Sequence, residues 1–205
     1  MIPEDYVATQ RLVNAFHSDG RVETETEDGI KYARILCNFF INSKLVPKSI
    51  LDVGCRTGYT LEVFEELIPT TRAVGVDIVP EFVDIALTRG EALVADMHAL
   101  PFKDNEFDWI LCTGSIEHAY DGDRACRELF RVAKDGIYLS ADCSPQEAFE
   151  ENPSHYTYKT GPSDWIVSCQ QPGWQLISLK MPSIGSADMM WVSADFWRTL
   201  QEPTI

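Results

Sequence analysis

The segment from Ser49 to Tyr59 constrains the fold most strongly, because it predicts a buried strand, a glycine turn and a helix start in direct succession. Residues 50–53 are mostly apolar and too few for a helix, so they favour a strand. Gly54 and Gly58 lack a Cβ, and the backbone there can take a positive φ or let a ligand approach closely. Residues 60–68 then show helical spacing of apolar side chains. This succession predicts a site for a nucleotide-like ligand, although a plain strand-to-helix turn explains the same residues.

The following residues repeat the alternation of strand and helix patterns, which is typical of an α/β protein with a parallel sheet. Strands are expected at residues 73–78, 92–95, 107–112 and 137–140. Helices are expected at residues 80–88 and 123–133, the latter followed by a break at Asp135-Gly136. The 205 residues suit one domain with a proper core.

The two ends of the chain are patterned differently. Residues 3–16 and, from about Asp28, residues 28–42 read as helices joined by a polar loop over residues 18–28. Residues 174–181 and 189–192 read as two closing strands, and the short loop between them favours an antiparallel pair.

The charge distribution disfavours a nucleic-acid partner. The net charge is −15, and residues 50–150 hold twenty acids and eight bases, so they carry −12 of it. Phosphate backbones are bound by basic surfaces, so a small molecule or a protein fits better than DNA or a long RNA.

Compartment and metal content follow from the cysteines and the apolar runs. The six cysteines form no CxxC pair, which predicts neither a zinc site nor a disulfide framework. No apolar run reaches the roughly 18 residues of a membrane span, and the N-terminus lacks the basic start of a signal peptide. A cytoplasmic protein without a membrane partner is expected, and its oligomeric state stays open.

Each expected strand ends in polar or small residues, and open parallel sheets bind ligands at that carboxyl edge. Asp77 ends the second strand, 25 residues after Asp52. In nucleoside-binding folds an acid about 20 residues past the glycine turn accepts hydrogen bonds from ribose hydroxyls. The alternative is a surface carboxylate that caps the next helix, and the spacing favours the ribose role.

Five ordered segments resemble the motifs of class I S-adenosylmethionine (SAM)-dependent methyltransferases. Residues 51–58, Leu-Asp-Val-Gly-Cys-Arg-Thr-Gly, resemble the first motif, and residues 74–77, Val-Gly-Val-Asp, the second. Residues 95–108 are similar to the third and fourth motifs of the small-molecule type 11 group, and residues 115–118 and 127–132 continue the match. The resemblance implies a Rossmann-like doubly wound sheet of seven strands, mostly parallel with an antiparallel C-terminal strand.

The resemblance also implies one methyltransferase domain over residues 1–205. Residues 1–48 would supply N-terminal helices, as a lid over the site or packed on the sheet edge. Residues 49–142 would form the SAM-binding core, and residues 143–205 the acceptor-side segment and the closing strands.

At the methionine end of the donor, the resemblance assigns backbone groups of Gly54, Cys55 and Gly58, with Asp52 near the ammonium. Arg56 stands where a glycine is commoner; it needs either an ordinary φ or a strained one, and it could reach the donor carboxylate. A nicotinamide fold needs GxGxxG, and Arg56 occupies the middle glycine position, so the sequence favours SAM over a dinucleotide.

At the nucleoside end, the resemblance assigns the ribose hydroxyls to Asp77 and adenine packing to Ile78. Asp96 would accept from the adenine amino group, beside the backbone of Met97. Two residues after the fourth strand would face the sulfonium, namely Thr113 and Ser115.

Catalysis is less defined, because methyl transfer from a sulfonium is a direct displacement and needs a base only if the acceptor starts protonated. His118 is the candidate base, with a structural histidine as the alternative. Glu117 is expected in the pocket or as a helix-start acid, and His155 and Tyr156 in the acceptor pocket or packed over it. The other histidines, His17 and His98, are expected at the surface.

The prediction is therefore a SAM-dependent methyltransferase that acts on a small-molecule acceptor and releases S-adenosylhomocysteine (SAH). Fold alone does not fix chemistry, so two alternatives stay open: a non-catalytic SAM-binding regulator or scaffold, and a protein methyltransferase.

Overall fold

The computed structural model describes residues 6–8, 10–11, 22–44, 46–142, 171–180 and 191–198. The expected acceptor residues His155 and Tyr156, the second part of the first helix and His17 lie outside these residues.

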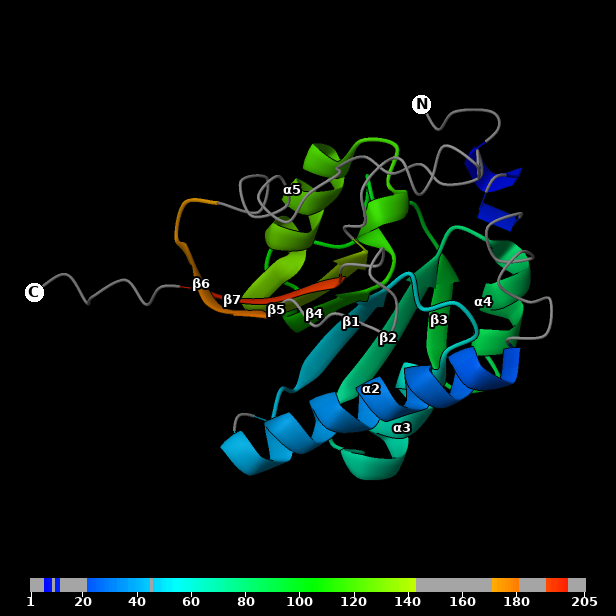
Figure 1. Ribbon diagram of the computed structural model, residues 1–205, viewed down its shortest axis with the longest axis horizontal. Helices are drawn as coiled ribbons and strands as arrows, with labels where there is room; N and C mark the ends of the chain where they lie inside the picture. The colour runs from blue at the N-terminus through cyan, green and yellow to red at the C-terminus, as the bar shows by residue number, and fades with distance from the viewer. Residues whose placement is uncertain are drawn as a thin grey trace, which may run out of the picture.

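A single sheet with strand order β3-β2-β1-β4-β5-β7-β6 organises the protein (Figure 1). Strands β1 to β5 pair in parallel, whereas β7 runs antiparallel to β5 and β6 antiparallel to β7. The strands are β1 (Ser49–Val53), β2 (Arg72–Asp77), β3 (Glu91–Val94), β4 (Phe107–Thr113), β5 (Ala133–Asp142), β6 (Trp174–Lys180) and β7 (Trp191–Arg198). The predicted α/β fold with a parallel sheet of five strands is confirmed.

Helices cover both faces of the sheet. On one face lie α2 (Val22–Ser43) and α3 (Tyr59–Leu67), and on the other lies α5 (Gly122–Val132), while α4 (Pro80–Ala86) packs against β2 and β3 (Figure 1). The alternation of side chains along a strand explains two buried clusters. Neighbouring residues of one strand therefore belong to different clusters: Ile50 packs with α2 and α3, and Leu51 packs with α5.

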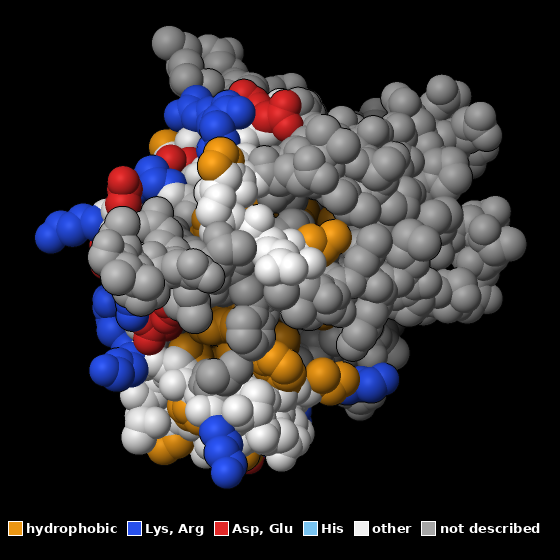
Figure 2. Space-filling model, turned by 90° about the vertical axis from the view of Figure 1, so that its left-hand side faces the viewer, with side chains coloured by type: hydrophobic (Ala, Val, Ile, Leu, Met, Phe, Trp, Pro, Cys, Tyr) orange, Lys and Arg blue, Asp and Glu red, His pale blue; other side chains and the backbone are white. Residues whose placement is uncertain are grey.

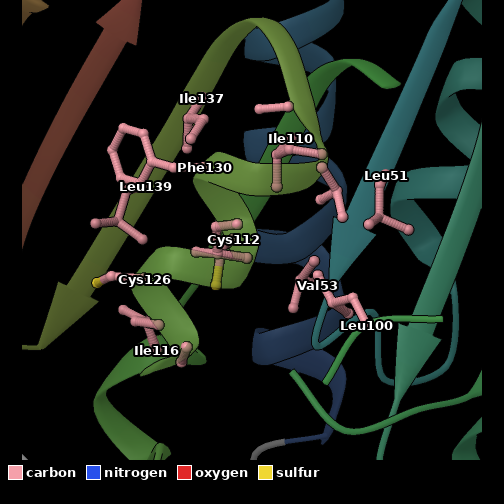
Figure 3. Packing of buried hydrophobic residues seen from close by; sticks show 14 of the residues in the cluster. Leu51, Val53, Leu100, Ile110, Cys112, Ile116, Cys126, Phe130, Ile137 and Leu139 are labelled. Carbon is pink, nitrogen blue, oxygen red and sulfur yellow. The ribbon is translucent and has the colours of Figure 1, made fainter. Parts of the chain in front are cut away.

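The cluster under α5 joins the ends of β1, β4 and β5. Cys126 and Phe130 of α5 and Ile116 lie against Val53 and Ile110 of the sheet (Figure 3). All five side chains are at most 5% exposed. This packing fixes the carboxyl ends of β1 and β4 relative to each other.

Three predicted boundaries are wrong. The last strand, expected at residues 189–192, continues to Arg198, because β7 pairs with β5 on one side and β6 on the other over this length. Helix α2 begins at Val22 rather than near Asp28, because the acids that suggested a loop are good helix formers and suit a helix N-terminus. Strand β5 begins at Ala133, and Asp135-Gly136 lies within it instead of breaking the chain. A Cβ on Gly136 would lie 2.5 Å from the Trp109 ring, so this glycine provides room for packing rather than a turn.

One charged cluster holds the loop between β3 and β4. The Arg131 guanidinium donates to the main-chain oxygens of Leu100 and Phe102 and forms ion pairs with Glu128 and Asp104. Glu128 in turn accepts from the Leu100 N–H at 2.8 Å. Residues 127–132 and 95–108 resemble separate motifs along the sequence, and these hydrogen bonds and ion pairs join them in the structure.

Candidate active site

The site lies where the strand order reverses, at the carboxyl ends of β1 and β4. Ligands of open α/β sheets bind at such a switch point. The strand order places β1 between β2 and β4, so the loops after all three strands meet there. This edge collects most of the residues that the sequence assigned to the donor.

The loop after β1 bends back on itself with three left-handed residues. Gly54, Arg56 and Gly58 have φ of 79°, 47° and 83°. The N–H groups of Gly54 and Cys55 both donate to the Val76 oxygen, at 2.8 and 3.0 Å. The strained alternative for Arg56 is therefore the one that this loop adopts.

Gly54 is required by a close contact with the loop after β4. A Cβ at Gly54 would lie 2.2 Å from the Ser115 Oγ, which itself bonds to the Thr113 oxygen at 3.2 Å. Gly58 is equally enclosed, because its Cβ would lie 2.9 Å from Ala86 of α4. The first motif thus closes against both neighbouring loops.

Asp77 holds the turn and faces the site. Its Oδ2 accepts from the Arg56 N–H and its Oδ1 from the Val79 N–H, each at 2.9 Å. Burial raises the pKa of Asp77, and the hydrogen bonds from Val79 and Arg56 partly oppose this. Each carboxylate oxygen has two acceptor directions, so Asp77 can stabilise the turn and still accept from a diol.

Asp52 is a buried acid at the end of β1, with 3% exposure. Burial raises the pKa of this carboxyl to about 7, a hydrogen bond with the Thr60 side chain lowers it, and the nearby Asp77 charge raises it further. A cation bound beside Asp52 would stabilise its charged form. The site therefore favours a ligand that carries a positive group at this point.

Asp96 lies after β3 in a set of aromatic side chains. Its Oδ1 accepts from the His98 N–H at 3.0 Å and contacts the His98 Nδ1 at 2.5 Å, and its Oδ2 accepts from the Tyr120 hydroxyl at 2.9 Å. His98 is 1% exposed, so the expectation of a surface histidine is wrong. The ring is buried because it stacks on Tyr120, with centroids 3.6 Å apart.

The residues after β4 form a short 3-10 helix, Ile116–His118. Glu117 is buried and His118 is half-buried, and the His118 N–H donates to the Ser115 oxygen at 3.1 Å. His118 thus lies next to the residues proposed to face the sulfonium. Its role as a base stays a prediction.

Helical residues 6–8 and 10–11 contact both sides of the site. Tyr6 is 1% exposed and lies edge-on to Tyr120, with centroids 4.8 Å apart. The Gln10 side chain donates to the His118 oxygen at 3.5 Å, and Arg11 pairs with Glu81 of α4 at 3.0 Å. The N-terminal residues therefore link the loops after β2 and β4.

The remaining predicted donor residues occupy the same edge. Cys55 packs over Gly75, whose Cβ would lie 2.6 Å from the Cys55 sulfur. Three others are half-buried: Ile78 and Met97 follow β2 and β3, and Thr113 is the last residue of β4. Sequence reasoning missed Tyr6, Gln10 and Tyr120, and no periodic pattern marks them. One feature of the sequence indicated the hydrogen bond between His98 and Asp96: His98 lies two residues after this aspartate, the spacing at which an aspartate side chain accepts from the main chain.

The three carboxylates define what this edge can bind. Asp52 lies near the end of β1, Asp77 ends β2 and Asp96 follows β3, and phosphate groups would be repelled by these three carboxylates. A primary amine, a diol and an exocyclic amino group would instead each find an acceptor. Among the residues that the structure describes, no group of three or more His, Cys, Asp or Glu side chains could hold a metal ion.

Comparisons with known proteins agree with this chemistry. Residues 51–141 match the family described as Methyltransferase domain. The demethylmenaquinone methyltransferase of Thermus thermophilus is 34% identical over 113 residues, covering 50% of this chain and 51% of that protein. A human protein named Probable tRNA methyltransferase 9B is 35% identical over 96 residues, covering 46% and 20%. The chain thus spans about half the length, or less, of these curated relatives.

A solved structure extends the likeness in fold. Magnesium protoporphyrin IX methyltransferase of Synechocystis PCC 6803, determined with bound SAH, superposes with a TM-score of 0.68 at 13% identity. The match covers 95% of this chain and 96% of that one.

Within the described part of the chain, no helix has both the length and the apolar character that crossing a membrane requires.

Proposed function

Through residues 51–141 the chain belongs to the type 11 family of class I SAM-dependent methyltransferases, and from this premise we propose that it transfers the methyl group of SAM to a small-molecule acceptor. The proposal includes the whole chain as one domain, with the seven-stranded sheet of the class. Its cofactor is SAM and its product SAH.

One observation carries the proposal: three carboxylates lie at the carboxyl ends of three adjacent strands, Asp52 near the end of β1, Asp77 at the end of β2 and Asp96 after β3. The ammonium of SAM fits the buried Asp52, the ribose diol fits Asp77, and the adenine amino group fits Asp96. SAM carries no phosphate, so these negative charges do not oppose its binding. A dinucleotide would place its pyrophosphate at the glycine turn, where Arg56 occupies the position of the middle glycine.

The charge of the surface supports a small acceptor over an RNA. Several basic side chains of the described residues form ion pairs with acids, as in Arg34–Glu66, Arg72–Glu91 and Lys134–Asp108. Figure 2 shows Lys and Arg side chains beside Asp and Glu side chains on one face. Cations that are already paired contribute little to phosphate binding. An acceptor that depends on a basic groove therefore fits this chain poorly.

The protein would contribute to this reaction mainly by positioning the donor and the acceptor. SAM supplies an activated methyl group, which moves directly from sulfur to the acceptor atom. The loops that carry Gly54 and Ser115 are in close contact with each other, and their main-chain groups would hold the donor. His118, whose main chain is fixed by Ser115 and Gln10, would take a proton at its imidazole if the acceptor starts protonated.

Calorimetry with SAM and SAH tests the donor assignment. We expect both to bind with one site per chain, and no binding of either would refute the proposal. Turnover is then measured with a panel of small O-, N- and C-acceptors, a basic peptide and a tRNA. If only the peptide or the tRNA is methylated, the proposal of a small-molecule acceptor is wrong. Binding of SAM without turnover of any acceptor would favour a SAM-binding regulator.

A further inference from the structure

The Asp96 carboxylate is held by an enclosed set of side chains that the donor assignment does not explain. His98 and Tyr120 both bond to it, and their rings stack with an interplanar angle of 21°. Tyr6 packs edge-on against both rings. A carboxylate that needed only to meet a ligand would not require two such partners, the buried His98 and the half-buried Tyr120.

The hydrogen bonds determine the tautomer of the His98 ring. The Asp121 main-chain N–H can only donate, and it points to the His98 Nε2 at 3.2 Å. Nε2 is therefore an acceptor, and the ring proton of a neutral imidazole is on Nδ1, where it is donated to Asp96 Oδ1. Asp96 accordingly remains a charged acceptor, and its pKa is lowered, since the bonds from His98 and Tyr120 outweigh the effect of burial.

The Asp96 carboxylate has one acceptor direction that the described residues do not use. A carboxylate offers about four, two on each oxygen. On Oδ1 the described residues use both, through the N–H and the Nδ1–H of His98. On Oδ2 they use one, through the Tyr120 hydroxyl. One direction on Oδ2 remains.

We propose that His98 and Tyr120 are positioning residues that set the base specificity of the donor site, by fixing Asp96 so that Oδ2 accepts one hydrogen bond from a 6-aminopurine. This rests on the proposed SAM function and adds to it the residues that select the base. A purine with an oxygen at position 6 presents an acceptor to Oδ2 and is rejected, because two acceptors that face each other repel.

The test uses the ratio of two affinities measured on one protein. The ligands are SAH and S-inosylhomocysteine, which differ by a 6-amino and a 6-oxo group, and calorimetry gives both dissociation constants. A merely structural role would change both affinities by the same factor, whereas base selection changes their ratio. The variants are Tyr120→Phe, which keeps the stacked ring, and Tyr59→Phe as the matched control on α3.

We expect the parent protein to prefer SAH by about a hundredfold. Tyr120→Phe should reduce this preference by about tenfold, the value of one hydrogen bond to a charged group. Tyr59→Phe should leave it unchanged. An unchanged ratio in Tyr120→Phe, or a parent protein that binds both ligands equally, would overturn the inference while the methyltransferase proposal stands.

Asp96→Asn gives a sharper outcome. Since His98 requires an oxygen at the Oδ1 position, the amide NH2 must take the Oδ2 position and present a donor to the base. This variant should therefore lose the preference for SAH and bind the 6-oxo analogue at least as tightly. A retained preference for SAH would show that Asp96 does not face position 6. Failure of the parent protein to bind either ligand would instead refute the proposed function.

Discussion

The Arg56 main-chain N–H donates to Asp77 Oδ2 at 2.9 Å, and this bond joins the glycine loop after β1 to the end of β2. Arg56 takes a left-handed φ of 47° to make it. The contact uses only the backbone of Arg56, so the loop can keep its shape with another residue at this position. It also explains why Asp77 is buried although it belongs to the ligand edge.

Asp77→Ala should weaken SAH binding by about a hundredfold, because two hydrogen bonds from the ribose to a charged group are lost. Calorimetry on this variant and on Asp84→Ala measures the effect. Asp84 is an exposed acid on α4 and serves as the control. An unchanged affinity of Asp77→Ala would remove the ribose assignment.

Arg56→Gly should raise the free energy of unfolding by about 1 kcal/mol, because glycine adopts a positive φ without strain. SAH affinity should stay within about threefold, since the bond to Asp77 is kept. Asn105→Gly is the matched control: Asn105 has a φ of 57° in the loop before β4. Urea denaturation should show a gain in both variants. A larger loss of SAH affinity in Arg56→Gly alone would show that the guanidinium contacts the donor.

Gly54→Ala should lower the free energy of unfolding by at least about 3 kcal/mol, because the new Cβ meets Ser115 in addition to the strained φ. Gly173→Ala isolates the backbone effect, since Gly173 has a φ of 81° and, among the residues that the structure describes, nothing lies within 4 Å of its Cβ position. That control should lose only about 1 kcal/mol. Equal losses in thermal or urea denaturation would contradict the contact with Ser115.

Asp52→Asn should stabilise the ligand-free protein at pH 8 and weaken SAH binding. The pKa of Asp52 rises from 3.8 to about 7 on folding, so the folded chain keeps a proton that the unfolded chain releases. The free energy of unfolding therefore falls as pH rises through this window, by at most about 4 kcal/mol. The variant should lack this decrease and match the parent near pH 4.

Urea denaturation of Asp52→Asn, the parent and Asp84→Asn at pH 4, 6 and 8 measures the difference. Asp84→Asn should follow the parent at each pH. If Asp52→Asn shows the same dependence as the parent, Asp52 is already charged in the folded protein.

Arg131→Ala should lower the free energy of unfolding by about 2 kcal/mol, because it removes bonds to two main-chain oxygens and leaves Glu128 without its cation. Lys134→Ala removes two ion pairs of an exposed lysine, with Asp108 and Asp135, and should cost under about 1 kcal/mol. Chemical denaturation compares the two. Similar losses would show that the loop between β3 and β4 does not depend on Arg131.

Local sequence patterns were sufficient to predict the existence of the strands and the carboxyl edge of the sheet. The apolar runs at residues 50–53 and 107–112 can be buried on both faces only in a covered parallel sheet, and the glycines after the first run mark the turn. The position of Asp77 also followed from spacing alone. These features are local, since each depends on residues within one strand and the turn that follows it.

Which side chains contact one another depends on how the elements pack in three dimensions. Asp96 and Tyr120 are 24 positions apart, and Tyr6 is the first residue that the structure describes. Strand order and register bring them together, and no periodicity in the sequence encodes that. The same holds for Gly136, whose absent Cβ makes room for Trp109 on the neighbouring strand. A pattern along one element reports which of its faces is buried, whereas the partner on that face is set by how the elements pack.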